Sequence, residues 1–163
     1  MRSDTPFEDI NFGDLPAPVN DLLQQGIRAY RSDRLRADGL FRHALTLDPA
    51  ALPAYLCLYK IHTYQGRLVD ARAVALAGMA EAACQSGWAS DWQYWSTGQG
   101  VAEGPARFAL YTLKALAFIA LRDNRPGDAD AKLAVLRRVD PAGAVGWPVI
   151  AALAEGIVAE AVA

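Results

Sequence analysis

Apolar residues recur every three or four positions along most of this 163-residue chain. This spacing places them on one face of a helix, as in the segment 34–49. No segment alternates apolar and polar residues over the length that a half-buried strand requires. The pattern therefore predicts an all-α fold of antiparallel helix pairs joined by short turns. The apolar face of the segment 34–49 consists of Leu35, Ala37, Leu40, Phe41, Ala44 and Leu47.

Proline, glycine and capping residues divide the pattern into helices. Residues 1–18 contain three prolines and one glycine among acidic residues, so we expect an extended N-terminal arm. Asn20 is then expected to cap a first helix that runs to about Tyr30. The later boundaries are predicted at Ser32-Asp33, Asp48-Pro49, Pro53, Gly66, Gly87, Gly104-Pro105, the turn 124–128, and a last helix from about Pro148 to Val162.

Two of the predicted helices carry similar sequences at a repeat-like distance. The segment "RLRADGLF" aligns with "RLVDARAV" when Ala37 is placed over Ala71. This separation matches the tetratricopeptide period of about 34 residues, and the order of small and large residues resembles that family. The residues that carry the resemblance in the second unit are Tyr55, Leu58, Gly66, Leu68, Ala71 and Gly78. In the first unit they are Gly26, Ala37, Phe41, Ala44, Asp48 and Pro49, and in the third Leu113, Leu116, Ala117, Ala120, Ala129, Leu133, Asp140 and Pro141.

The resemblance organises the chain as a single domain of three repeat-like units. After the arm 1–18, the units span 19–49, 50–85 and 106–141, and a capping helix spans 146–162. Ala71 and Ala129, the equivalent positions of the second and third units, are separated by much more than one period, so residues 86–105 form an insertion. At the position where the family has glycine, the third unit has Asn124. The resemblance implies a right-handed superhelix of antiparallel helix pairs.

The resemblance also implies a concave groove, lined by the first helix of each pair, that binds a peptide segment of another protein. Lys114 is the only charged residue in the apolar run 108–121, so it must reach water, pair with a carboxylate or meet a ligand anion. Lys60 has the same alternatives. The candidate groove residues are Cys57, Lys60, Tyr64, Tyr111, Lys114, Phe118 and Arg122, and Ala115 is expected to face the groove beside them.

The insertion holds three of the four tryptophans of the chain. One interpretation is a lid whose aromatic rings pack on the apolar first helix of the third unit and fill the gap that the insertion opens in the stack. The other is an exposed aromatic platform that binds a partner. Both interpretations hold together if one edge of the lid stays exposed to solvent. The residues concerned are Trp88, Trp92, Tyr94 and Trp95.

Charge and composition exclude several classes of function. Sixteen basic and eighteen acidic residues give a formal net charge of −2, without the basic stripe of a nucleic-acid-binding protein. The apolar run 108–121 is shorter than the roughly 20 residues that cross a membrane, and the acidic N-terminus lacks the apolar region of a secretory signal. Cys57 and Cys84 lie in apolar stretches and are expected to be reduced core residues. We therefore expect a cytoplasmic protein that binds neither nucleic acid nor membranes.

No combination of residues suggests catalysis. The two histidines have no metal-ligating partner at helical spacing, and no nucleophile elbow or phosphate loop is present. The sequence predicts a non-enzymatic protein, without cofactor or metal, that acts as an adaptor or chaperone-like module on a peptide segment of a partner. One alternative is a self-associating module that dimerises through the apolar C-terminal helix. Another is a small-molecule-binding or enzymatic protein with a pocket under the tryptophan-rich insertion.

Overall fold

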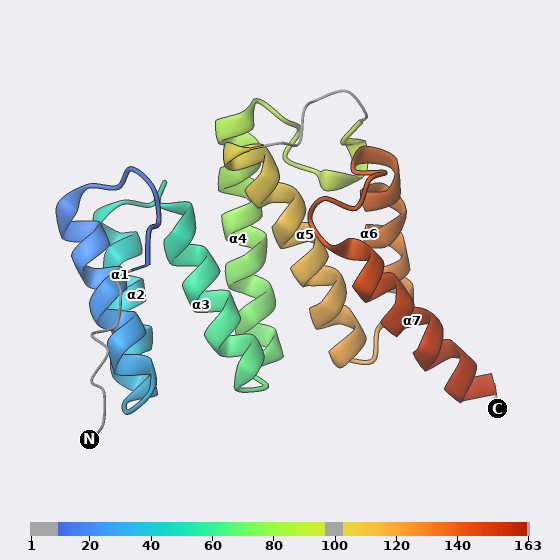
Figure 1. The fold of residues 1–163 in the computed structure, drawn as a ribbon, viewed down its shortest axis with the longest axis horizontal. Helices are drawn as coiled ribbons and strands as arrows, with labels where there is room; N and C mark the ends of the chain where they lie inside the picture. The colour runs from blue at the N-terminus through green and yellow to red at the C-terminus, as the bar shows by residue number, and fades with distance from the viewer. Residues whose placement is uncertain (1–9, 97–102, 163) are drawn as a thin grey trace, which may run out of the picture. The chain divides into compact units, whose positions relative to one another are not determined.

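The computed structural model describes residues 10–96 and 103–162, and within these ranges the regular elements are all helices, without a β-strand (Figure 1). The predicted all-α class is therefore confirmed. Residues 1–9 of the expected arm and 97–102 of the insertion lie outside the described residues. The helices are α1 (Ala17–Tyr30), α2 (Arg34–Leu47), α3 (Leu52–Tyr64), α4 (Leu68–Ser86), the short 3-10 helix η1 (Trp92–Tyr94), α5 (Gly104–Arg122), α6 (Pro126–Val139) and α7 (Trp147–Val162).

The chain forms two compact units, residues 1–57 and 58–163, with α3 running across the boundary. In the first unit α1 and α2 pack against each other. The two helices approach closely at Gly26, where a Cβ atom would overlap the ring of Phe41. Phe41 is buried, as is Leu23 one turn from Gly26. Glycine at position 26 therefore lets the two helices come close enough to enclose this ring.

The start of α1 differs from the prediction. The helix begins at Ala17, because Pro18 sits in its first turn, where the amide hydrogen that proline lacks would have no helical acceptor. Asn20 does not cap the helix; its side chain accepts a hydrogen bond of 3.1 Å from Nε2 of Gln24. Gln24 also bonds the backbone of Ile10 through both its oxygen and its nitrogen, at 3.2 and 2.7 Å. The side chain of Gln24 thus anchors the residues before α1.

Other boundaries follow the predicted local chemistry. Asp33 caps α2 by accepting a hydrogen bond of 3.0 Å from the amide of Arg36. Gly87 ends α4 in the left-handed conformation with φ of 69°. Asn124 adopts the same conformation, φ of 58°, in the turn between α5 and α6. Asparagine tolerates this region better than most residues, which explains how it replaces glycine there.

The core of the second unit forms around α5. This helix packs against α4 on one side and α6 on the other, and α7 contacts both α5 and α6. Its buried residues, among them Leu110, Leu113 and Leu116, extend around more than one face. The chain leaves α4 and re-enters α5 at the same end of the two helices (Figure 1). The expectation that the insertion opens a gap in the stack is therefore wrong, because α4 remains the direct neighbour of α5.

The length of α5 bears on the expectation that the apolar run 108–121 is too short to cross a membrane. The helix has 19 residues and is long and apolar enough to cross a membrane by length and composition alone. More than half of this stretch, 56%, is buried inside the structure. A buried core helix has the same length and composition, so this feature is weak evidence for a membrane span.

Candidate functional site

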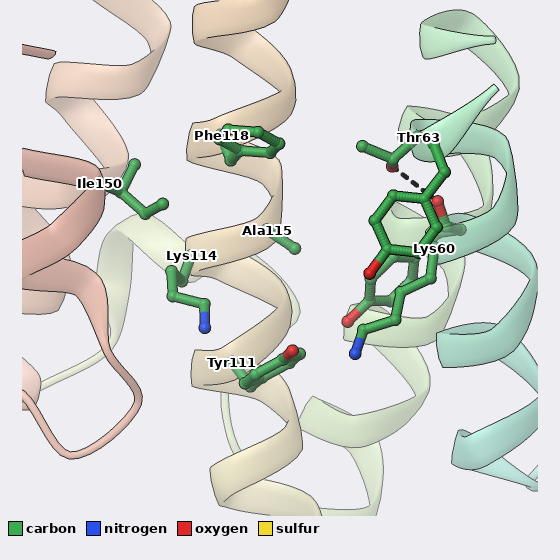
Figure 2. Close-up of a pocket in the computed structure, with 9 residues that line it drawn as sticks. Lys60, Thr63, Tyr111, Lys114, Ala115, Phe118 and Ile150 are labelled. Atoms are coloured by element: carbon green, nitrogen blue, oxygen red, sulfur yellow. Dashed lines mark hydrogen bonds between the residues drawn. The ribbon is translucent and has the colours of Figure 1, made fainter. Parts of the chain in front are cut away.

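A pocket of about 190 Å³ lies in the second unit between α3, α5 and α7 (Figure 2). Most of its wall is aromatic or aliphatic, and two amines line it. The second half of α3 supplies one side, α5 the opposite side and α7 a single isoleucine. The lining residues are Tyr59, Lys60, Thr63, Tyr64, Tyr111, Lys114, Ala115, Phe118 and Ile150.

Two polar contacts hold α3 against α5 at this pocket. The hydroxyl groups of Tyr59 and Thr112 lie 3.2 Å apart, and both residues are buried. At the other end of the pocket the guanidinium of Arg122 donates a hydrogen bond of 2.6 Å to the carbonyl oxygen of Thr63. This carbonyl is near the C-terminus of α3 and also accepts a hydrogen bond of 3.1 Å from the amide of Gly66. The spacing of the two walls is therefore fixed by bonds outside the pocket's apolar surface.

Both pocket lysines converge on one aromatic ring. The Nζ atom of Lys114 lies 3.9 Å from the centre of the Tyr111 ring, and Nζ of Lys60 lies 5.6 Å from the same centre. Figure 2 shows both amines at the end of the pocket where Tyr111 lies. Neither lysine forms an ion pair with a carboxylate in the part of the chain that the structure describes. The ring therefore gives the two cations a cation–π contact but no neutralising charge.

The surroundings of Lys114 disfavour its positive charge. Burial lowers the pKa of its amine below the ordinary 10.5, and the charges of Lys60 and Arg107 lower it further. Tyr111 acts in the opposite direction but does not restore the ordinary pKa. The backbone at Gly146 also lies close to this amine: a Cβ atom built at Gly146 would be 3.5 Å from Nζ of Lys114. Lys114 is thus a half-buried cation whose charged neighbours are themselves cationic.

Replacing Lys114 with methionine is expected to stabilise the free protein. The lowered pKa means that the folded chain binds this proton less tightly than the unfolded chain, so the unfavourable contribution is full below the folded pKa and disappears as the pH rises to 10.5. Because water screens this half-exposed amine, we expect the melting temperature of Lys114→Met to exceed that of the wild type by only about 2 °C at pH 7, corresponding to less than about 1 kcal/mol in a chain of this size. Circular dichroism melts at pH 7 and pH 10 measure this difference, which should shrink at the higher pH. A lower melting temperature of the variant at pH 7 would contradict it.

Most of the predicted groove residues come together in the pocket. Lys60, Tyr64, Tyr111, Lys114, Ala115 and Phe118 all line it. The remaining two do not. Cys57 is half-buried at the end of the first unit, and Arg122 is exposed and contacts α3 through the Thr63 carbonyl.

Three lining residues were missed by the sequence analysis. Tyr59 and Thr63 lie on α3 beside predicted residues. Thr63 is three residues from Lys60, which is a usable helical signal, whereas Tyr59 is adjacent to Lys60 and shares a face with Thr63 instead. Ile150 comes from α7, and its place depends on the loop after α6. There the buried carboxylate of Asp140 accepts hydrogen bonds from the amides of Ala144 and Val145, at 3.0 and 3.1 Å. No pattern within α7 itself indicates this return path.

The tryptophan-rich segment divides into a buried and an exposed part. The ring of Trp95 is 1% exposed, and its Nε1 donates a hydrogen bond of 2.8 Å to the carbonyl of Ala89. Trp88 packs edge-on against it, with ring centres 5.0 Å apart. Tyr94, in contrast, is 77% exposed. The segment is thus held by its own aromatic cluster and leaves one aromatic side chain at the surface.

The described part of the segment contacts α6 through η1. Arg138 of α6 donates hydrogen bonds to the carbonyls of Trp95 and Gln93, the shortest being 2.7 Å. Lys132, also on α6, lies 5.1 Å from the centre of the Trp92 ring. Basic side chains of α6 therefore hold the described part of the segment.

The described residues contain no group of three or more histidine, cysteine or acidic side chains that could hold a metal ion. Cys57 and Cys84, both in the described part of the chain, form no disulfide. The expectation that both belong to the core is wrong for Cys84, which is exposed on α4, while Cys57 is half-buried. An apolar stretch predicts a helix but leaves open which of its faces is covered.

The sequence matches no model of a known protein family, and comparisons with curated proteins and with solved structures give no match. The function is therefore argued from the pocket and its charges.

Proposed function

We propose that this protein is a non-catalytic binding module, an adaptor or chaperone-like protein of the cytoplasm, that receives a peptide segment of a partner protein in the pocket between α3, α5 and α7. The segment presents an acidic side chain next to an aromatic or aliphatic one. The observation that carries the proposal is the pair of pocket amines, Lys60 and Lys114, which lack a carboxylate partner among the described residues and flank an apolar wall.

The size of the pocket favours a single side chain as its occupant. Sites for cofactors and drug-sized ligands enclose about 300 to 1,000 Å³. The pocket here has about 190 Å³, and an apolar cavity of roughly 150 Å³ accommodates a benzene ring. One aromatic or branched side chain of a peptide therefore fills it, with the rest of the segment lying outside.

The charge of the pocket favours an anionic neighbour. The chain as a whole carries a formal charge of −2, yet the charges of Lys60 and Arg107 both act on Lys114 without a compensating carboxylate among the described residues. A carboxylate from a partner would offset this repulsion, and close charge pairs at interfaces contribute both affinity and specificity. The unfavourable free energy of burying the Lys114 charge is then offset only when the carboxylate of the partner is bound.

The helix boundaries support the further proposal that the pairs belong to a tetratricopeptide-like, right-handed superhelix. The second helices of the first two pairs, α2 and α4, begin at Arg34 and Leu68, which are one period of about 34 residues apart. The equivalent helix of the third pair, α6, begins at Pro126, well beyond the next period, as the insertion requires. In such an array the first helices, here α3 and α5, line the groove, and these are the helices that supply both lysines.

A selection from a random peptide library tests the proposal. The wild type and the variant Lys60→Ala/Lys114→Ala are immobilised, and the sequences that each retains are compared. We expect the wild type to enrich peptides with Asp or Glu beside an aromatic or aliphatic residue, and the double variant to lose them. Lys132→Ala is the matched control, because it removes a buried lysine of the same unit that lies outside the pocket. Enrichment of the same sequences by the wild type and the double variant, or of none by the wild type, would refute the proposal.

A second candidate function is self-association through α7. Val149 and Leu153, four residues apart on this helix, are 66% and 46% exposed, so two apolar side chains share one uncovered face. A homodimer formed there would show a concentration-dependent mass in sedimentation equilibrium, abolished in Val149→Glu/Leu153→Glu. A monomeric mass at all concentrations would eliminate this candidate. A pocket under the tryptophan-rich segment is less favoured, because the ring of Trp95 is buried there.

A further inference from the structure

Lysine is rare in this protein, and its distribution is uneven. Only three of the sixteen basic residues are lysine, namely Lys60, Lys114 and Lys132, and the other thirteen are arginine. Two of the three lysines line one pocket. Where the chain needs an exposed positive charge it uses arginine, so the amine groups of the side chains are concentrated at the proposed binding site.

Lysine differs from arginine in one chemical property that matters in an apolar pocket. Its amine can lose the proton and then act as a nucleophile, whereas a guanidinium stays protonated. Burial beside a second cation is the usual way in which proteins activate an amine. Lys114 meets both conditions, since it is half-buried and lies with Lys60 against the ring of Tyr111. The same surroundings lower the pKa of its amine.

The pocket has the dimensions of a small aromatic molecule. Its volume of about 190 Å³ exceeds the roughly 150 Å³ that hold benzene, which leaves room for one substituent on the ring. Phe118, Ile150 and Ala115 supply apolar contacts for such a ring, and the two amines lie toward the Tyr111 end (Figure 2). A ring bound among these side chains can direct a polar substituent toward Lys114.

We propose that this pocket binds single-ring aromatic aldehydes and that Lys114 condenses with them to form a Schiff base. The lone pair of the neutral Nζ attacks the carbonyl carbon, a C–N bond forms, and the C=O π electrons move to the oxygen, which takes up one proton from the nitrogen. The C–O bond then breaks, the oxygen leaves as water with the second amine hydrogen, and a C=N bond remains between Lys114 and the ligand. Nothing is oxidised or reduced in the step, and its by-product is one water molecule. The proposal rests on the pocket and not on peptide binding, so either can fail without the other.

Benzaldehyde with sodium cyanoborohydride tests the proposal on the folded full-length chain. The reagent reduces the Schiff base to a stable benzylamine, and peptide mass spectrometry gives the rate of modification at each lysine. Lys132 is an internal control, because burial also lowers its pKa but it lies over Trp92 and lines no part of this pocket. We expect Lys114 to react at least about tenfold faster than Lys132 and Lys60, a moderate gain for a ligand held next to its nucleophile.

Two further measurements separate binding in the pocket from simple amine reactivity. Excess benzyl alcohol, which fills the pocket without reacting, is expected to slow modification of Lys114 and leave Lys132 unchanged. Lys114→Arg keeps the charge and should abolish the fast reaction without transferring it to Lys60. Equal rates at Lys114 and Lys132, fastest reaction at Lys60, or no effect of benzyl alcohol would each overturn the proposal.

Discussion

Replacing Trp95 with alanine is expected to lower the free energy of unfolding by about 3 to 5 kcal/mol, the usual effect of truncating a buried aromatic side chain. The ring is 1% exposed, packs edge-on against Trp88 and donates a hydrogen bond to the carbonyl of Ala89. The backbone carbonyl of Trp95 also accepts the bonds from Arg138 that hold the segment to α6. Loss of the ring therefore leaves a cavity and weakens the attachment of the described part of the segment between α4 and α5.

Tyr94→Ala is the matched control for this change. Tyr94 is the neighbouring aromatic residue and is 77% exposed, so its removal should alter stability by less than about 0.5 kcal/mol. Urea unfolding followed by circular dichroism measures both variants. A Trp95→Ala variant as stable as Tyr94→Ala would show that the aromatic cluster does not contribute to the core, and would revive the interpretation of an aromatic binding platform.

Asp140→Ala is expected to cost about 2 to 4 kcal/mol, because the buried carboxylate accepts hydrogen bonds from two amides of the loop before α7. Asp140 is 3% exposed, so water can hardly take its place. One of the two amides belongs to Val145, which is itself buried. Without the carboxylate both amides lose their partner, and the loop loses the contact that directs the chain into α7.

Asp140→Asn distinguishes the hydrogen bonds from the volume of the side chain. Asparagine has nearly the same shape but only one acceptor oxygen, so we expect a loss intermediate between the wild type and Asp140→Ala. Because α7 supplies Ile150 to the pocket, both variants should also bind pocket ligands more weakly. Chemical unfolding gives the first quantity, and a titration of any peptide selected by the wild type gives the second. Equal stability of Asp140→Ala and the wild type would contradict this role of the carboxylate in the loop.

The sequence predicts the helices well because their signals are local. The Asp33 cap, the left-handed Gly87 and the turn at Asn124 depend on residues within a few positions of each helix end. The start of α1 at Ala17 has an equally local reason: the proline content of residues 1–18 predicts an arm, but proline is also favoured in the first turn of a helix, where Pro18 lies.

The candidate site was partly predictable for a similar reason. Lys114 and Phe118 lie four residues apart on α5, so one helical face brings them together once Tyr111 is placed on it. Only the family resemblance predicts that Lys114 and Phe118 lie near Lys60, because no residue pattern within α5 specifies that α3 lies opposite it. The place of Ile150 and the contact between the tryptophan-rich segment and α6 depend on long-range bonds from Asp140 and Arg138, which have no periodic signal.

Binding of an acidic and aromatic peptide segment through the two pocket lysines can be measured directly. The experiment determines the dissociation constant of one fixed peptide, Ala-Ala-Glu-Phe-Ala-Ala with blocked ends, and of its Gln counterpart, for the wild type and for Lys60→Ala/Lys114→Ala. We expect the Glu peptide to bind the wild type more tightly than the Gln peptide does. This preference should disappear in the double variant, with a coupling energy of at least about 1.5 kcal/mol. Equal affinity of the two peptides for the wild type, or a preference for Glu that survives in the double variant, would contradict the proposed function.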